Sequence, residues 1–203
     1  METTKRQDEI VALMRTVLGD TYTHLLVRRV VTEDDIDSGE TSVTCEVTDE
    51  ISGDKSVIAG KGVGIVDAFF KGMISRFAED YPSLKTIRFH SFDVCAQLDT
   101  KQAHAGTDSE GEVTLEVANS EDKVFVFKHA SRSVTAAAIV ATLHALEHFI
   151  NGERAFVSLH HALKDAKARN RSDLVQEFTM KMATLVKNTS YSEVIDRINQ
   201  DIG

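Results

Sequence analysis

The feature that most constrains this chain is a repeated order of elements, in which three strand-like runs precede an amphipathic helix. The runs, marked by alternating or β-branched apolar residues, are 23–31, 41–48 and 55–60 in the first half and 86–97, 111–118 and 123–128 in the second. Helical patterns follow at residues 66–77 and 133–149. Because the repeat of roughly 65 residues exceeds a solenoid unit, we predict an α+β fold of two pseudo-symmetric βββα units.

Helical patterns also flank these units on both sides. Ile10, Leu13, Met14 and Val17 share one face of an opening helix. After a predicted helix stop at Asn151-Gly152, three further helical stretches cover residues 154–168, 173–187 and a short segment with the capping box Ser190-Tyr-Ser-Glu193. The chain has one proline and no flexible linker. We therefore expect an N-terminal helix (1–21), one domain (22–152, with units 22–83 and 84–152) and a helical appendix (153–203).

Composition excludes several classes of function. Acidic residues outnumber basic ones by 32 to 23, and the resulting net charge of -9 disfavours nucleic acid and anionic membranes as partners. The longest apolar runs are far shorter than the ~20 residues of a membrane helix, and the charged N-terminus lacks a signal peptide's apolar stretch. The two cysteines, Cys45 and Cys95, each lie in a strand-like run. We expect a cytoplasmic protein with two free, buried thiols.

A glycine loop, Gly60-Lys-Gly62-Val-Gly64, lies between a predicted strand and a predicted helix. Free NH groups at such a helix start can hold an anion such as a carboxylate. The loop does not fit a dinucleotide fingerprint, because Ile65 or Asp67 stands where the last glycine is required, and a Walker loop needs Lys and then Ser or Thr after its last glycine. A tight strand-to-helix turn is the competing interpretation, and the loop alone favours it.

One histidine motif and two serines are of residue types that occur in catalytic sites. His144-Ala-Leu-Glu147-His148 has the H-x-x-E-H arrangement of one zinc peptidase class. A third ligand is required, and the adjacent His160 and His161 point in different directions on a helix. We therefore favour half-exposed helix histidines over a metal site. Ser131 and Ser133 resemble helix N-caps, because no Gly-x-Ser-x-Gly elbow surrounds them. We expect no enzyme activity, metal or cofactor.

Three motifs stand in order along the two halves; they are Gly62-Val-Gly64-Ile-Val66-Asp67-Ala68, Phe92-Asp-Val94 and Gly106-Thr107-Asp108-Ser109-Glu-Gly111-Glu-Val113. Together they resemble the C-terminal regulatory domain of 2-isopropylmalate synthase and citramalate synthase. The first is similar to its G-x-G-P-V-D-A segment, with Ile65 in place of the proline, the second to its Tyr-x-Val strand, and the third to its G-T-D-A-x-G-x-V segment. The alanine-rich helix resembles the family's closing helix, with Ser133 where an aspartate often stands. The resemblance covers roughly residues 22–150.

This resemblance implies a homodimeric, non-catalytic domain that binds a branched-chain amino acid between its two units, as in feedback control of leucine biosynthesis. It places the α-carboxylate on the backbone from Gly62 through Gly64 to Val66, beside Ala68. By the same resemblance, the ligand's ammonium group would bind Asp67 or Asp108, which follows Thr107. Its apolar side chain would lie in a pocket lined by Phe89, Phe92 and Val66. Each residue also has a plain structural role: a dipole-compensating Asp67, an Asx turn at Asp108, and core phenylalanines.

Two functional interpretations follow from the resemblance. The first is a regulatory domain that binds a small amino acid or a related carboxylate and controls a synthase in trans; a catalytic barrel of about 250 residues does not fit in this chain. The second is a dimerisation or interaction module that has lost the ligand pocket, in which the helical appendix contacts the partner. The residues that depart from the family pattern keep the second interpretation open; they are Ile65, Ser109 and Ser133.

Overall fold

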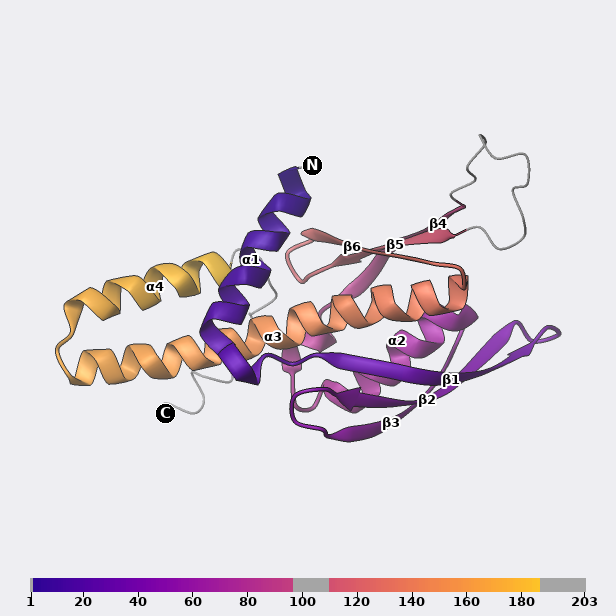
Figure 1. Cartoon of the computed structure of the whole chain (residues 1–203), viewed down its shortest axis with the longest axis horizontal. Coiled ribbons are helices and arrows are strands. Elements are labelled where there is room, and N and C mark those ends of the chain that lie inside the picture. The colour runs from indigo at the N-terminus through magenta and orange to yellow at the C-terminus, as the bar shows by residue number, and fades with distance from the viewer. Residues whose placement is uncertain (1, 97–109, 187–203) are drawn as a thin grey trace.

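The computed structural model describes residues 2–96 and 110–186. Two βββα units form the body of the molecule (Figure 1). The first unit consists of β1 (Leu25–Asp35), β2 (Glu40–Asp49), β3 (Lys55–Gly62) and α2 (Gly64–Phe77). The second consists of β4 (Arg88–Ala96), β5 (Gly111–Ala118), β6 (Val124–Ser131) and α3 (Val134–Ala168). The flanking helices are α1 (Glu2–Leu18) and α4 (Ser172–Val186), and short 3-10 turns occupy Gly19–Thr21 and Pro82–Lys85.

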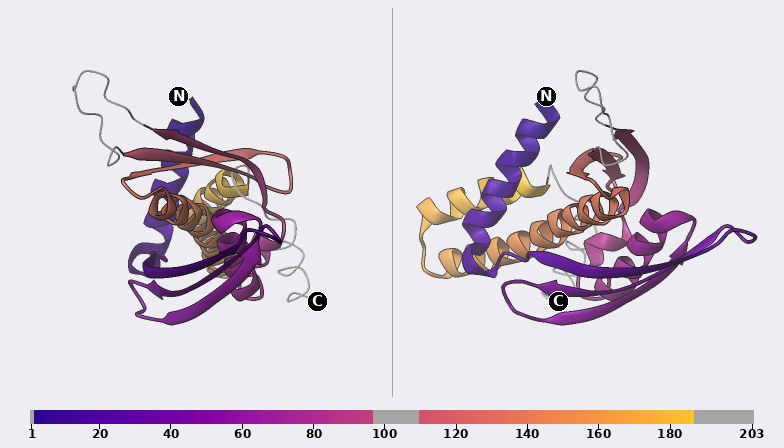
Figure 2. Two further views of the ribbon diagram at one scale, coloured as in Figure 1. Left: turned by 90° about the vertical axis from the view of Figure 1, so that its right-hand side faces the viewer. Right: turned by 45° about the vertical axis from the view of Figure 1, so that its right-hand side comes forward.

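The two sheets face each other across a layer of two helices. Each sheet is an antiparallel meander, with strand order β1-β2-β3 in one and β4-β5-β6 in the other. Helix α2 packs on β2 and β3, α3 packs on β5 and β6, and the two helices also contact each other (Figure 2). The inner faces of both sheets and both helices share one hydrophobic core. The predicted α+β fold of two βββα units is confirmed.

The first strand of each unit carries an irregularity at a corresponding place. In β4 the pairing with β5 shifts between Phe89 and Ser91, so that one extra residue, His90, stands on β4. In β1 the pairing with β2 shifts between Val27 and Val30. A bulge of this kind resets which side chains point inward. It keeps both Phe89 and Phe92 on the inner face of the sheet, which explains the imperfect alternation of apolar residues in this stretch.

Helix α3 corrects the sequence prediction of a helix stop at Asn151-Gly152. The helix runs unbroken for 35 residues, and both of these residues are buried inside it. The prediction failed because Asn151 makes its hydrogen bonds to another element rather than to the end of its own helix. By length and composition α3 is apolar enough to cross a membrane, but its most apolar stretch is 72% buried within the protein. Core packing accounts for that hydrophobicity.

Polar side chains on α3 hold the chain segment that leads into β1. Asn151 accepts a hydrogen bond from Thr23 N and donates one to Thr23 O, each at 2.8 Å. One turn earlier, Glu147 Oε1 accepts from Leu25 N at 2.6 Å and lies 3.1 Å from His24 Nδ1. One turn later, Arg154 donates to the Thr23 hydroxyl. These contacts, which we call the α3 clamp, fasten the first unit to the helix of the second.

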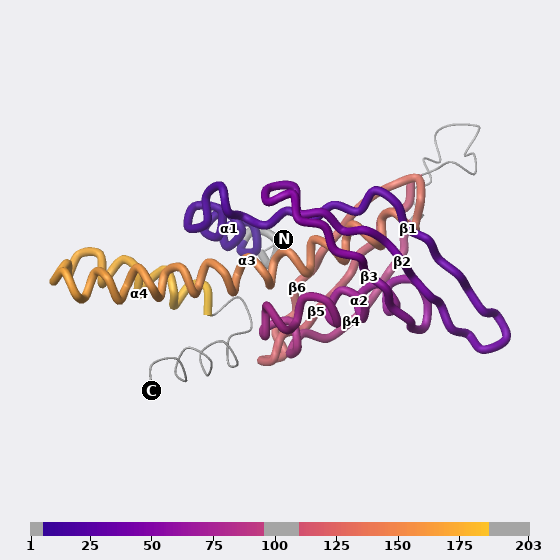
Figure 3. The backbone as a smooth tube through the Cα atoms, turned by 90° about the horizontal axis from the view of Figure 1, so that it is seen from below, coloured from indigo at the N-terminus to yellow at the C-terminus, as the bar shows by residue number. Residues whose placement is uncertain are grey.

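The helices at the two ends of the chain form a separate arm. The C-terminal half of α3 and α4 make an antiparallel hairpin that extends away from the sheets, and α1 packs across it (Figure 3). A second hydrophobic cluster joins the three helices; its buried members are Ile10, Met14, Leu18, Tyr22, Ala155, Phe156, Leu159 and Leu185. The predicted capping box at Ser190 and Glu193 lies outside the described residues.

The two thiols lie in different environments. Both cysteines are free, as predicted. Cys45 is buried on the inner face of β2, where desolvation raises its pKa to about 11. The prediction that Cys95 is buried is wrong, because its side chain is exposed. It stands opposite Glu112 on the solvent-facing side of β4, whereas its neighbour Val94 is opposite the buried Val113.

The α3 clamp predicts a large effect of one polar substitution. Asn151→Leu removes both hydrogen bonds to Thr23 and leaves a buried backbone NH and carbonyl unsatisfied. We expect the free energy of unfolding to fall by about 2–4 kcal/mol. Urea denaturation followed by circular dichroism measures this. Ser158→Ala, on the exposed side of the same helix, is the control and should change stability by less than about 0.5 kcal/mol. Equal stability of the two variants would contradict the role of the clamp.

Candidate functional site

A cavity of about 490 Å³ lies where the start of α2 meets strand β4. It brings together five of the residues singled out in the sequence; they are Gly64, Val66, Asp67, Phe89 and Phe92. These residues come from both βββα units, so the cavity lies at the junction between the units. Val63, Ile65, His90 and Ser91 complete its lining.

The remaining predicted site residues lie elsewhere. Ala68 is fully buried in the core and does not line the cavity. Gly62 ends β3 beneath the first turn of α2, where an added Cβ would lie 2.3 Å from Asp67 Oδ2 and 2.7 Å from Ala68 N. A glycine is therefore required for close packing of strand and helix. Thr107 and Asp108 lie outside the described residues, and so does Ser109.

The first turn of α2 presents backbone NH groups without a side-chain cap. The N-cap residue is Val63, which has no side-chain acceptor, and Gly64 has a φ of 81°, a conformation that disfavours side chains. The first NH groups of a helix have no acceptor within the helix and carry partial positive charge. Helix α3 differs, because Ser133 Oγ accepts a hydrogen bond from Ala136 N and confirms the predicted N-cap.

Asp67 folds back over the same turn. Its Oδ2 accepts hydrogen bonds from Val63 N at 2.9 Å and from Lys71 Nζ at 2.7 Å. Desolvation raises the pKa of this carboxyl group, but these two hydrogen bonds and the charge of Lys71 outweigh it and hold the pKa below its usual value. The carboxylate therefore stays ionised and stabilises the helix start, the structural role that the sequence left open. Among the described contacts, none reaches Oδ1.

Two aromatic side chains of β4 form the opposite wall. Phe89 is half-buried and stacks in a tilted geometry on Phe70 of α2, with ring centroids 4.5 Å apart. Phe92 stands opposite the buried Leu115, yet 41% of it is exposed, because β4 is the edge strand of its sheet. The sequence reasoning missed Val63, His90 and Ser91. The only signal for the last two was the broken alternation that marks the bulge.

The residues of the histidine motif on α3 pack against other side chains or hydrogen-bond to the backbone of the first unit. His148 is buried, contrary to the expectation of half-exposure, and packs edge-on against Phe127 and Phe149. His144 is half-buried, and Glu147 belongs to the α3 clamp. Desolvation lowers the pKa of His144, with a further contribution from His129. Within residues 2–96 and 110–186, no group of three or more metal-ligating side chains is placed to hold a metal ion.

The contacts of Asp67 predict a graded effect on stability. Asp67→Asn keeps an oxygen for Val63 N but loses the charge, so we expect a loss of about 0.3–1 kcal/mol. Asp67→Ala loses the hydrogen bond from Val63 N as well and should cost about 1–2 kcal/mol. Urea denaturation of both variants measures these losses. Asp37→Asn, at an exposed turn, is the control and should be neutral. The stabilising role of Asp67 at the helix start is wrong if Asp67→Ala is as stable as the parent protein.

Comparison with known proteins adds the family to this geometry. A search of curated proteins gives no match. A family model described as the LeuA allosteric (dimerisation) domain matches residues 5–150, which cover most of α1, the first βββα unit, the second unit up to the middle of α3, and the lining of the cavity. This range is most of the chain and includes the glycine loop, strand β4 and the start of α3. The chain therefore belongs to the family of LeuA allosteric (dimerisation) domains.

Proposed function

We propose that this chain is a non-catalytic regulatory dimer that binds a small branched-chain amino acid or a related carboxylate, and that it controls a synthase on a separate chain. The observation that carries the proposal is the cavity itself. It sets the uncapped first turn of α2 against Phe89 and Phe92, within a family of allosteric domains. An anionic group and an apolar group on one small ligand match these two walls.

In this proposal each wall of the cavity binds a different part of the ligand. The α-carboxylate accepts hydrogen bonds from the NH groups of the first turn of α2, where the helix dipole also favours negative charge. The branched side chain lies against Val66, Phe89 and Phe92. The ammonium of an amino acid binds Oδ1 of Asp67, because Oδ2 already accepts two hydrogen bonds. A 2-oxo or 2-hydroxy acid would lack this last contact.

A ligand screen with two variants tests the site. We expect apolar amino acids or their 2-oxo or 2-hydroxy analogues to raise the Tm of the whole chain, because a ligand of the native state stabilises it. Calorimetric titration of the best ligand should show binding at least about tenfold weaker in Phe92→Ala. Asp67→Asn should weaken binding of an amino acid by about tenfold or more, and leave binding of a 2-oxo acid unchanged.

Val57→Ala is the matched control for Phe92→Ala, because Val57 is exposed on the outer face of β3, far from the cavity. It should bind as the parent protein does. Unchanged affinity in both site variants would place the ligand elsewhere. If no compound raises the Tm while the protein remains dimeric, the dimerisation module without a ligand pocket is the better description.

Exposed apolar residues around the cavity support a dimer contact on this face. Val63 is 84% exposed at the rim, and Phe92 and Val94 on the inner face of β4 are 41% and 46% exposed. Their cross-strand partners Leu115 and Val113 are fully buried. Exposed apolar side chains on an edge strand, next to the buried core, are typical of a surface that a second copy of the chain covers. We place the dimer contact here.

One charged substitution tests this contact. Val94→Lys puts an ammonium into the proposed interface, so we expect the protein to shift from dimer to monomer in sedimentation velocity at micromolar concentration. Val57→Lys introduces the same charge on the outer face of the other sheet and should leave the dimer intact. A dimer that persists in Val94→Lys would place the contact on another face. A parent protein that is monomeric at all concentrations would remove the dimer from the proposal.

A further inference from the structure

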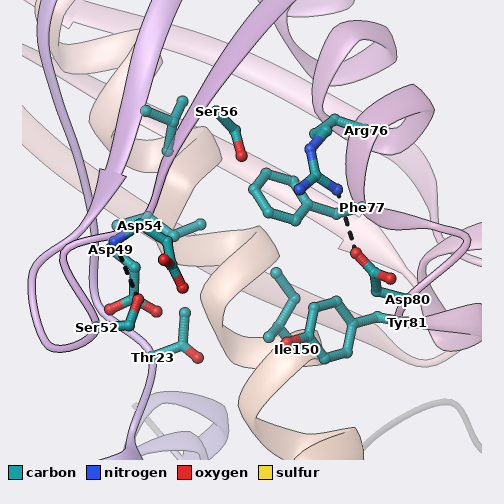
Figure 4. Close-up of a pocket in the computed structure, with 12 residues that line it drawn as sticks. Thr23, Asp49, Ser52, Asp54, Ser56, Arg76, Phe77, Asp80, Tyr81 and Ile150 are labelled. Carbon is teal, nitrogen blue, oxygen red and sulfur yellow. Dashed lines mark hydrogen bonds and ion pairs between the residues drawn. The ribbon is translucent and has the colours of Figure 1, made fainter.

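A second cavity lies at the opposite end of α2 from the first. Its volume is about 170 Å³, and it is enclosed by the β2–β3 turn, the C-terminal end of α2 and one residue of α3 (Figure 4). Sheet residues Leu25 and Val47 and helix residues Phe77 and Ile150 form its apolar floor. None of the site residues suggested by the sequence lines this cavity, and it shares no lining residue with the first cavity.

The walls of the second cavity carry an excess of negative charge. Asp49 and Asp54 stand on the turn side, while Asp80 and Arg76 face them from the end of α2 (Figure 4). Arg76 NH1 is already paired with Asp80 Oδ2 at 3.1 Å. Within the described part of the chain, no Lys, Arg or His pairs with Asp49 or Asp54. Two carboxylates on one wall are therefore left without a counter-ion from this part of the protein.

The end of helix α2 adds to the negative charge of this region. The C-terminal end of a helix carries partial negative charge, and α2 ends at Phe77 in the cavity wall. Tyr81 also lines the cavity, and burial raises the pKa of its hydroxyl group. Arg154 opposes this increase, whereas the charges of Asp80, Glu153 and Asp49 add to it. The carboxylates, the helix end and the aromatic floor together favour a cation that also has an apolar part.

We propose that the second cavity binds a short primary amine, with its ammonium on Asp49 and Asp54 and its alkyl chain over Phe77 and Ile150. The size agrees, because an engineered protein cavity of about 150 Å³ accommodates benzene, so about five or six non-hydrogen atoms fit. An ammonium donates up to three hydrogen bonds, and this wall offers carboxylate oxygens as acceptors.

Other classes of ligand match these walls less well. A divalent metal ion requires several converging oxygen ligands, and no such group occurs among the described residues. An α-amino acid would also bring a carboxylate, and the one cationic side chain in the lining, Arg76, is already engaged with Asp80. A neutral molecule would gain nothing from the charges of Asp49 and Asp54, which are solvated in its absence. An amine makes use of both the charge and the apolar floor.

Isoleucine methyl NMR on the full-length protein separates the two cavities, because Ile150 lines the second and Ile65 lines the first. Titration with n-butylammonium chloride should shift the Ile150 methyl resonance along a saturable curve and leave that of Ile65 in place. Ile150→Val identifies the resonance in a reference spectrum. Potassium chloride at the same ionic strength should not reproduce the shift, and n-butanol should bind at least about tenfold more weakly, because it lacks the charge.

Charge-neutral variants give the second readout. Asp54→Asn should weaken butylammonium binding by about tenfold, and the double variant Asp49→Asn, Asp54→Asn further still. Both asparagines keep an acceptor oxygen, so the hydrogen bond from Ile51 N to residue 49 is retained. Asp37→Asn removes an equal charge from a distant turn and should bind as the parent does. An unmoved Ile150 methyl, a butanol response as strong as that of butylammonium, or parental affinity in the double variant would each overturn the proposal.

Discussion

The α3 clamp is the interaction on which the rest of the fold depends, because it fixes the two βββα units relative to each other. Each sheet packs on its own helix, and such a unit exposes the other side of that helix. Glu147 and Asn151 satisfy the backbone of residues 23–25 from the middle of α3, so β1 starts at a defined height along that helix. Hydrogen bonds impose a direction and a register that apolar packing alone does not. The first cavity lies between elements of the two units, whose relative placement this register sets.

Helix α2 gives the two cavities opposite character. Its 14 residues span about 21 Å, at about 1.5 Å of rise per residue. The first cavity lies at the end where free NH groups favour an anion, and the second at the end where carbonyl groups favour a cation. The helix start at the first cavity has no side-chain cap on its N-cap residue. At the second cavity, Asp49 and Asp54 have no cationic partner among the described residues, whereas Asp80 is paired with Arg76. One helix therefore borders both proposed sites, the one for a carboxylate and the one for an ammonium group.

The sequence predicted what depends on local pattern. Strand periodicity, the glycine loop and the order of elements all have a period or a spacing, and the two-unit fold followed from them. The meeting of Gly64, Asp67, Phe89 and Phe92 was implied by the resemblance to the family instead. The failures have a common physical cause. Asn151 was predicted to end the helix because its hydrogen-bond partners lie 128 residues away in the chain. Cys95 was predicted to be buried because a strand pattern alone does not indicate that one face of its sheet is uncovered. The second cavity left no local signal at all, because it arises only where the β2–β3 turn meets the end of α2.

The continuity of α3 has a mechanical consequence for the arm. Residues up to 150 belong to the matched family domain, and the same helix continues to Ala168 and into the hairpin with α4. The helix is about 52 Å long, and a helix without a proline or a glycine pair bends little. Its glycine near the middle, Gly152, is buried and lies between Asn151 and Arg154 of the clamp, which hold this part of the helix in place. Any displacement of α3 between the sheets is therefore carried outward to the α3–α4 hairpin. Because the arm extends away from the sheets, a rigid rotation of α3 would displace its far end more than the part that lies between the sheets.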